Sequence, residues 1–340
     1  MIDINDYDFY LPEELIAQHP LERRDDSKLL CYYKDQDKII DKKFSDIADL
    51  LDEGDILVLN NSRVIPARIY GSRENKDESV EFLLLHEKEK DIWECLVKPG
   101  KKAKVGSKFY FGDKLMLEVL SFDEEGIRTV KMHYKGVLLE ILEEIGTMPL
   151  PPYIHEKLKD QERYQTVYSK IPGSAAAPTA GLHFTNELLE KIKYKGIELE
   201  YITLNVGLGT FKPVTEQDAS KHKMHSEDYF ISEEVAEKIN NAKANGKKIV
   251  AVGTTTVRTL ESAVENGKLI PGHHSTDIYI YPGYEFKMID SLITNFHLPK
   301  STLIMLVSAL IGREKTLDIY KYAVENRYRF FSFGDAMFIR

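Results

Sequence analysis

The hydrophobic periodicity of the chain changes twice, and this change limits the possible folds more than any other feature. Between residues 63 and 132, apolar residues occur in short alternating runs separated by turn residues. Before and after this block, helical patterns alternate with short apolar strands. Short alternating runs are typical of an antiparallel barrel or sandwich, and helix–strand alternation is typical of an α/β domain. We therefore predict an α/β domain of residues 1–62 and 150–340, with an antiparallel β-barrel domain of residues 63–149 inserted into it.

The elements expected in the α/β domain follow from periodicity and from helix start and stop signals. The helices are expected at residues 44–51, 186–194, 233–245, 254–266 and 302–311, and the strands at residues 55–59, 198–204, 248–252, 277–281 and 291–294. A further helix at residues 137–145 is followed by a proline-rich connector at residues 149–152. The length of 340 residues also favours two domains over one.

Composition excludes several classes of protein. The longest apolar stretch, residues 303–311, is about half of the roughly 20 residues that span a bilayer, so a membrane protein is excluded. The acidic first residues lack a basic-then-apolar leader, and we expect a cytoplasmic protein. Two cysteines, Cys31 and Cys95, are too few for a disulfide framework, an iron–sulfur centre or a tetrahedral metal site, and both are expected to be buried thiols. The net charge of −9 means that any contact with nucleic acid must be local.

A run of threonines at a strand-to-helix junction is the first candidate site. In residues 248–261 a strand and a glycine precede Thr254, Thr255 and Thr256, with Arg258 one turn further along. The first turn of a helix has unpaired N–H donors and a partial positive charge, so a carboxylate or phosphate would bind well there. The alternative is that Thr254 only caps the helix.

Two segments of small residues leave binding and packing equally open. Residues 174–185 are mostly small and include Thr179 and His183, so the backbone could approach either a ligand or a neighbouring element closely. Residues 204–214 contain a Gly-x-Gly after a strand, but the third glycine is missing and Pro213 prevents a dinucleotide-binding helix.

Histidines and carboxylates gather in the second half of the chain. His222 and His225 are three residues apart but have no dependable third ligand nearby, so metal binding is disfavoured. An acid/base role for His225 or Glu227 and an ordinary solvated surface both remain open. Asn295 and His297 follow a predicted strand, at the edge where α/β sheets bind ligands.

Aromatic and basic residues mark two further segments. Residues 328–335 are aromatic and end in Asp335; they form either core or a stacking wall for a purine. Residues 98–108 contain five lysines and no acidic residue, which indicates either a loop that follows a phosphate backbone or a solvated hairpin.

Taken together, these segments closely resemble the S-adenosylmethionine:tRNA ribosyltransferase-isomerase family of queuosine biosynthesis. The matching blocks occur in order along nearly the whole chain, whereas residues 73–135 match only loosely. The blocks are residues 15–20, 59–68, 173–185, 207–214, 224–227, 252–262, 276–287, 293–308 and 328–337. The resemblance implies an α/β domain with an inserted β-barrel.

The resemblance also implies the reaction. The ribosyl group of S-adenosylmethionine is transferred to 7-aminomethyl-7-deazaguanine at the wobble position of certain tRNAs, giving epoxyqueuosine and releasing adenine and methionine. S-adenosylmethionine is thus a consumed substrate, and no separate cofactor, metal or membrane is expected. The partners are S-adenosylmethionine and the tRNA that carries the modified base.

Site roles are hypotheses on this resemblance. A base must remove a ribose C5′ proton, which the sulfonium acidifies, and we expect His225 or Glu227 to do so. Adenine leaves protonated or hydrogen-bonded, which suits His297, Asn295 or Asp335. The methionine carboxylate needs a donor-rich cationic pocket. The residues expected to bind the substrate are Thr179, His183, Thr254, Thr255, Thr256, Arg258, Asn295 and Lys300. The residues expected to contact tRNA phosphates are Arg63, Arg68, Lys101, Lys102 and Lys104.

Two other functions are weighed against this one. A non-catalytic RNA-binding protein would use the barrel for RNA and would not need the polar motifs of the second half. A methyltransferase using the same sulfonium would need no RNA, and its product would be S-adenosylhomocysteine. An assay for free adenine distinguishes these three functions, because only the ribosyltransferase-isomerase should release adenine when tRNA bearing the precursor base is present.

Overall fold

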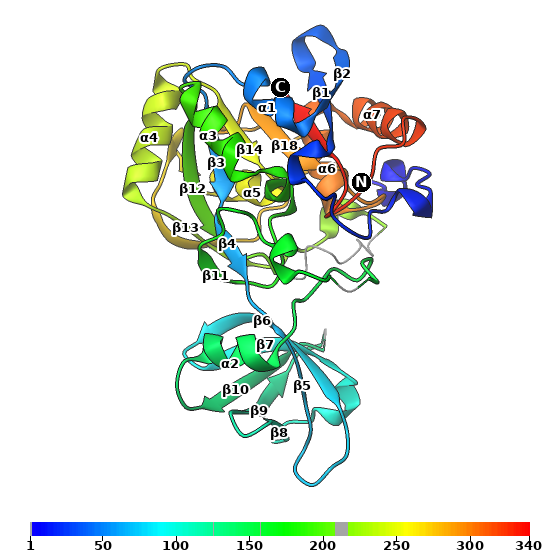
Figure 1. Cartoon of the computed structure of the whole chain (residues 1–340), viewed down its shortest axis with the longest axis vertical. Helices are drawn as coiled ribbons and strands as arrows, with labels where there is room; N and C mark the ends of the chain where they lie inside the picture. The colour runs from blue at the N-terminus through cyan, green and yellow to red at the C-terminus, as the bar shows by residue number, and fades with distance from the viewer. Residues whose placement is uncertain (1, 125, 157, 208–216) are drawn as a thin grey trace.

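The computed structural model describes residues 2–124, 126–156, 158–207 and 217–340, and they form two bodies joined by a narrow waist (Figure 1). The larger body is built on a mixed sheet of nine strands, and the smaller on a six-stranded antiparallel sheet. The predicted fold class, an α/β domain combined with an antiparallel β-barrel, is confirmed.

The large sheet has a parallel centre and antiparallel edges. Strands β12, β3, β14 and β18 are parallel neighbours, and β19 pairs antiparallel with β18 and parallel with β1. In spatial order the strands are β17 (Gly272–Thr276), β13 (Glu227–Ile231), β12 (Glu198–Leu204), β3 (Ile56–Asn60), β14 (Ile249–Val252), β18 (Ser291–Asn295), β19 (Ala336–Ile339), β1 (Lys28–Tyr33) and β2 (Lys38–Lys43).

Helices cover both faces of this sheet. Successive strand residues point to opposite faces. Leu57 and Leu59 of β3 therefore pack with α1 (Ile47–Leu50) and α3 (Asn186–Tyr194), while Ile56 and Val58 pack with the other face. That second face is covered by α4 (Glu233–Ala244), α5 (Thr254–Ser262), α6 (Thr302–Ile311) and α7 (Arg313–Glu325).

The barrel is closed by its first and last strands. Its spatial order is β5 (Arg68–Gly71), β6 (Val80–Glu89), β7 (Ile92–Lys98), β10 (Arg128–Tyr134), β9 (Leu115–Phe122) and β8 (Lys108–Phe111). Ser72, after β5, and Tyr110 of β8 exchange two backbone hydrogen bonds of 3.1 and 2.8 Å. Helix α2 (Leu138–Ile145) inserts Ile141 and Leu142 into the barrel core.

A short parallel pair joins the two bodies. Strand β4 (Ser62–Val64) leads into the barrel. Strand β11 (Ile171–Ser174) follows the barrel in the chain and pairs with β4. The remaining elements are the short pair β15 (Val264–Glu265) and β16 (Lys268–Leu269), and short 3-10 helices. These 3-10 helices include Ile4–Tyr7, Glu13–Leu15, Arg24–Asp26, Lys34–Gln36, Phe44–Asp46, Gly100–Lys102, Gln161–Tyr164, Thr179–His183 and Ala219–Lys221.

Some element predictions are wrong. Residues 277–281 form no strand, because side chains satisfy their backbone: Thr276 Oγ1 accepts from Ile278 N, and Arg258 donates to Ile278 O. The helix expected at residues 254–266 ends at Ser262. The elements that were not predicted are β1, β2, β11, β13, β15, β16, β17, β19 and α7.

Both cysteines are buried and free, as predicted. In the described part of the chain, no helix has the length and apolar character needed to cross a membrane. Within the same residues, no three His, Cys, Asp or Glu side chains gather as metal ligands would. The Gly-x-Gly stretch at residues 204–214 lies largely outside the described residues.

Candidate active site

A cavity opens at the carboxyl ends of β14 and β18, beside the first turns of α5 and α6. We call it the strand-end cavity, and its volume is about 90 Å³. Ligands commonly bind at this edge of α/β sheets. Six of the sequence-predicted site residues line it, and these are Thr179, Thr254, Thr255, Asn295, His297 and Lys300.

The threonine run is positioned by the turn from β14 into α5. Gly253 lies at φ +86° and ψ 153°, a conformation open essentially to glycine alone. The Thr256 hydroxyl turns back and donates to Val252 O at 2.7 Å, and Thr256 does not line the cavity. Thr255 Oγ1 is buried and has no hydrogen-bond partner among the described residues. A buried unpaired hydroxyl at a cavity wall is a group that a ligand can satisfy.

Asn295 connects the cavity to His183 through a chain of hydrogen bonds. Thr179 Oγ1 donates to Asn295 Oδ1 at 3.1 Å, and Asn295 Nδ2 lies 3.1 Å from His183 Nε2. The amide nitrogen can only donate, so His183 Nε2 accepts and its Nδ1–H donates to Ser27 Oγ at 2.8 Å. Burial, aided by Arg329 and Arg24, lowers the pKa of His183 to about 3, consistent with this neutral form.

His297 is neutral at pH 7 as well. Its Nε2 lies 3.0 Å from Thr294 Oγ1, and its backbone N–H donates to the Tyr320 hydroxyl at 3.1 Å. Burial lowers the pKa of His297 to about 3. In this state the ring can exchange hydrogen bonds with a ligand but does not carry a positive charge.

Tyr153, which sequence reasoning did not single out, lines the cavity together with Phe331 and Ser332 of residues 328–335. The Tyr153 hydroxyl lies 2.6 Å from Ser332 Oγ, and the Tyr153 and Phe331 rings are 4.8 Å apart. These side chains supply the aromatic wall that residues 328–335 had suggested. Lys300 Nζ pairs with Asp8 at 2.9 Å.

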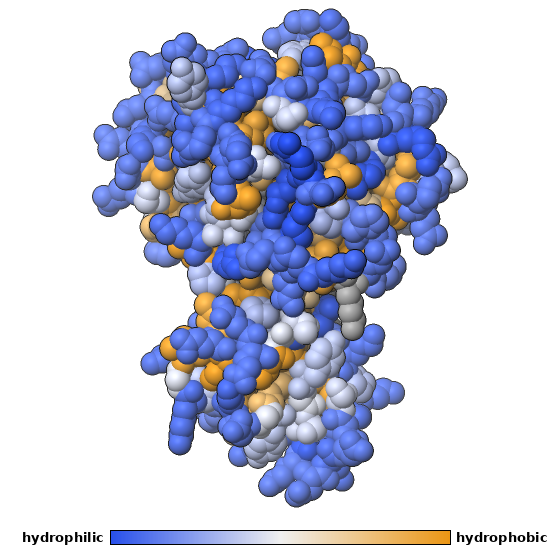
Figure 2. Space-filling view, viewed as in Figure 1, coloured by the Kyte–Doolittle hydropathy of each residue, from blue (hydrophilic) through white to orange (hydrophobic). Residues whose placement is uncertain are grey.

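A second cavity lies between the two bodies, and we call it the interdomain cleft. Its volume is about 400 Å³. The α/β side contributes Asn205, Ser226 and Glu227, and the barrel side contributes apolar residues with Trp93 and His86. Figure 2 shows apolar (orange) surface at the waist between the bodies. The Trp93 indole Nε1 and Asn205 Oδ1 are both buried without hydrogen-bond partners in the described chain.

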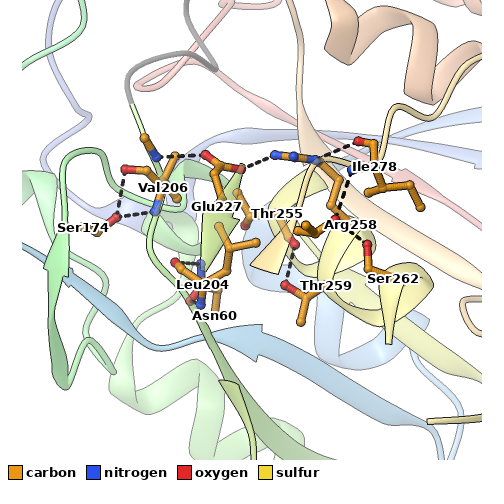
Figure 3. A network of polar contacts seen from close by, with 12 residues as sticks. Asn60, Ser174, Leu204, Val206, Glu227, Thr255, Arg258, Thr259, Ser262 and Ile278 are labelled. Atoms are coloured by element: carbon orange, nitrogen blue, oxygen red, sulfur yellow. Dashed lines mark hydrogen bonds and ion pairs between the residues drawn. The ribbon is translucent and has the colours of Figure 1, made fainter. Parts of the chain in front are cut away.

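A buried ion pair connects β13 to α5 beside this cleft (Figure 3). The side chains of Glu227 and Arg258 are each 4% exposed, and Arg258 Nη1 bonds to Glu227 Oε2. The other carboxylate oxygen accepts from Gly207 N at 2.8 Å. Arg258 also donates to Ile278 O at 3.3 Å, and its Nη2 is buried without a partner in the described segments. Arg258 therefore does not line the strand-end cavity with Thr254 and Thr255.

The remaining candidate catalytic residues are less central. His225 is partly buried two residues before Glu227 and lines neither cavity. Asp335 is buried away from both cavities, where its carboxylate accepts backbone N–H groups from Lys28 at 2.9 Å and Arg329 at 2.8 Å. This carboxylate holds the final loop onto β1.

Three of the five predicted tRNA contacts are paired with carboxylates. Arg63 binds Glu162 through both guanidinium nitrogens, at 2.5 and 3.2 Å. Arg68 and Lys102 pair with Glu81 and Glu78 at 3.6 and 2.9 Å. Lys101 and Lys104 are exposed, and the described residues form no ion pair with them.

Comparisons with known proteins agree on one family. Residues 4–339 match the model of a family described as queuosine biosynthesis protein. The chain is 58% identical over 337 residues to an S-adenosylmethionine:tRNA ribosyltransferase-isomerase of Clostridioides difficile (strain 630), with 98% of this chain and 99% of that protein covered. It is 38% identical to an S-adenosylmethionine tRNA ribosyltransferase from Thermotoga maritima, whose 2.00 Å crystal structure matches with a TM-score of 0.57 over 98% of this chain and 100% of that one.

Proposed function

Because the chain belongs to the queuosine biosynthesis protein family and is a transferase-isomerase of that family, we propose that it moves the ribosyl group of S-adenosylmethionine onto a tRNA base. The acceptor in this proposal is 7-aminomethyl-7-deazaguanine at the wobble position. The product is epoxyqueuosine in tRNA, with adenine and methionine released.

The observation that carries the proposal is that consecutive residues of one segment line the two cavities. Val206 lines the strand-end cavity, and its neighbours Asn205 and Gly207 line the interdomain cleft. A group transfer between a small donor and a macromolecular base needs two such spaces that meet at the reacting atoms. The strand-end cavity alone is smaller than the ~300–1,000 Å³ of typical ligand pockets. We therefore place the ribose and sulfonium of S-adenosylmethionine between the two cavities. Its adenine and its methionine carboxylate then lie in the strand-end cavity.

The donor's two ends find suitable partners in the strand-end cavity. The methionine carboxylate suits the first turn of α5, where Thr254, Thr255 and the helix dipole favour an anion. Adenine suits the wall of Tyr153 and Phe331, with Asn295 and His297 as hydrogen-bond partners. Since His297 is neutral, it assists adenine by hydrogen bonding rather than as a cationic acid.

The acceptor base suits the interdomain cleft. A wobble base in a single-stranded anticodon loop can be turned out and stacked on an aromatic side chain, and Trp93 lies on the barrel wall. The cationic aminomethyl group suits the side of the cleft that carries Glu227 and Asp228.

The bond changes balance without a further cofactor. A base, for which Glu227 and His225 remain our proposals, takes the C5′ proton. The C–S bond breaks with its electron pair on sulfur, which gives methionine. The glycosidic bond breaks with its pair on adenine, which takes up a proton. The neutral aminomethyl nitrogen forms a new C–N bond at C4′ and loses a proton, while the C4′–O bond of the sugar ring breaks. The C5′ electron pair bonds to C1′ and closes a five-membered carbon ring, and the former ring oxygen replaces sulfur on C5′ to give the epoxide. The tRNA backbone is proposed to contact Lys101 and Lys104, which carry no carboxylate partner in the described chain.

The proposal is tested with S-adenosylmethionine labelled in adenine and, separately, in methionine. Both labels should be released as free adenine and free methionine only when tRNA bearing the modified base is present. Release of S-adenosylhomocysteine would indicate a methyltransferase. Tight tRNA binding with no turnover of the donor would indicate a non-catalytic RNA-binding protein.

A further inference from the structure

Three arginines converge on a shallow depression on the α/β body, and we call them the arginine cluster. They are Arg24, Arg163 and Arg329, and they share the depression with His183 and Ser332. The three come from segments far apart in sequence: the 3-10 helix Arg24–Asp26, the 3-10 helix Gln161–Tyr164 and the loop before β19. Convergence of three like charges costs free energy unless an opposite charge is bound there.

Most partners of the cluster are backbone carbonyls rather than carboxylates. Arg24 donates to Gln165 O at 2.8 Å, to Glu162 O at 2.9 Å and to Leu182 O at 3.3 Å. Arg163 donates to Glu22 O at 3.1 Å and to Leu21 O at 2.5 Å. Carbonyls satisfy N–H donors and fix the guanidinium planes, but they carry no full negative charge to offset the cations.

Among the described residues, one carboxylate, that of Asp335, pairs with the cluster. Over the described residues, neither Arg24 nor Arg163 forms an ion pair, and Arg163 Nε is buried without a partner. Arg329 Nε is 3.9 Å from Asp335, whose carboxylate accepts two backbone N–H groups. The side chain of Glu162 is held by Arg63. The pKa of Arg24 is lowered first by burial and then by the neighbouring cation Arg163, and the charges of Asp160 and Glu162 offset part of this lowering.

We propose that the arginine cluster binds a backbone phosphate of the acceptor RNA. This inference rests on the proposed RNA acceptor. Ser332 lines both the depression and the strand-end cavity, so a phosphate at the cluster lies one side chain away from the proposed donor site. Arginine guanidinium groups bind phosphate through paired hydrogen bonds, and phosphate contacts fix the register of a nucleic acid on its protein.

The first test measures the salt dependence of RNA binding. Anticodon stem-loop RNA is titrated into wild type and Arg329→Gln across a series of KCl concentrations. Each lost phosphate contact lowers the slope of log K against log[KCl] by about 0.7–0.9. Arg329 is the variant of choice because its polar contacts are long, at 3.4 Å to His19 O and 3.9 Å to Asp335. Arg329→Lys keeps the charge and should retain most of the slope.

The matched control is Arg313→Gln. The side chain of Arg313 is 41% exposed, against 27% for Arg329, and it pairs with Asp6 at 2.6 Å at the start of α7, so the slope should not change. S-adenosylmethionine affinity and thermal unfolding of each variant are measured alongside. The donor affinity should stay at the wild-type value in Arg329→Gln, and the unfolding temperature reports the balance between relieved charge repulsion and the lost contact with Asp335.

The second test locates the phosphate. Single methylphosphonates, which remove one backbone charge each, are placed through the anticodon loop. At one position the substitution should weaken binding to wild type but not to Arg329→Gln, because the contact is already lost there.

The outcomes distinguish this inference from the proposed function. An unchanged salt slope in Arg329→Gln, or equal losses for both proteins at every methylphosphonate, overturns the arginine cluster and leaves the proposed function standing. No RNA binding by wild type overturns both. If pyrophosphate raises the melting temperature of wild type but not of Arg329→Gln while the RNA slopes agree, the cluster binds a small anion and the RNA assignment is overturned.

Discussion

Buried polar atoms without partners are the residue-level feature that best marks the two cavities. Thr255, whose Oγ1 is unpaired, lines the strand-end cavity, and Trp93 and Asn205, which carry the other unpaired atoms, line the interdomain cleft. Folding leaves such atoms unpaired at a cost of about 1–3 kcal/mol each, unless a ligand or water completes them. Sequence reasoning selected Thr255 because threonines precede a helix, but residue type alone could not distinguish it from Thr256.

Replacing Thr255 by valine separates binding from stability. In Thr255→Val the dissociation constant for S-adenosylmethionine should rise by about 2–10-fold, the equivalent of one hydrogen bond of about 0.5–1.5 kcal/mol. The free energy of unfolding should change little, because the hydroxyl makes no bond within the described protein. In Thr256→Val the donor affinity should hold while the protein loses about 1 kcal/mol of stability with the bond to Val252 O. Calorimetric titration and urea unfolding measure both, and identical behaviour of the two variants would refute the assignment.

The buried histidines make stability depend on pH. The pKa of His183 is about 3 in the folded protein, against about 6.5 in an unfolded chain. Between these values the unfolded state binds a proton that the folded state does not, so stability is lost as pH falls below 6.5 and is constant above it. The expected slope is about 1.4 kcal/mol per pH unit for this group. Between pH 6 and 5, wild type should lose about 1 kcal/mol more than His183→Gln in urea unfolding. Parallel curves for the two proteins would show that His183 is not the neutral group described.

At the level of elements, the site depends on where strands end and helices begin. The sequence predicted β3, β12, β14, β18, α3 and α6 closely, because each is a strongly periodic or fully apolar segment bounded by a cap or a turn. Elements β1 and β2 were missed because their register is set by pairing with distant β19 and with each other rather than by local pattern. Residues 277–281 were predicted to form a strand, but the backbone N–H and C=O of Ile278 are hydrogen-bonded to the side chains of Thr276 and Arg258 instead of to a neighbouring strand. Such tertiary competition cannot be read from local sequence.

Two glycines with the same backbone conformation test how the β14–α5 turn supports the site. Gly253 and Gly312 lie at φ +86° and +85°, each immediately before a helix. An added Cβ would have only ordinary contacts at Gly253 and none within 4 Å at Gly312, so the cost in both is backbone strain of about 1–3 kcal/mol. Gly253→Ala and Gly312→Ala should therefore lose similar stability. Only Gly253→Ala should also weaken S-adenosylmethionine binding, because Thr254 and Thr255 follow it directly. Equal donor affinities in the two variants would mean that this turn does not form the donor site.

On the scale of the whole molecule, the barrel matters because it provides the second wall of the interdomain cleft. The sequence indicated a barrel and placed several site residues at strand ends, and Thr179, Thr254, Asn295 and His297 do meet there. It could not indicate that Trp93 faces Asn205 and Glu227 across the waist, because that contact depends on how the two bodies are joined through β4 and β11. It likewise spread the expected RNA contacts over basic residues that the fold pairs with carboxylates, and it missed Arg24, Arg163 and Arg329, which converge only in the folded chain.

The single tryptophan offers a direct observation of this cleft. Trp93 is the chain's only tryptophan, so its emission reports on the barrel wall without interference. Its side chain is buried with an unpaired Nε1 at the cleft, and a base stacked there would change its polarity and quench it. Anticodon stem-loop carrying the modified base should change the emission with a midpoint equal to its dissociation constant, whereas S-adenosylmethionine alone should not. Trp93→Phe should keep donor affinity and weaken RNA binding, since stacking on an aromatic side chain is worth about 1–3 kcal/mol per base and a smaller ring recovers only part of it. If RNA binds with full affinity to Trp93→Phe and leaves the wild-type emission unchanged, the acceptor base enters elsewhere, and the barrel serves only to hold the rest of the tRNA.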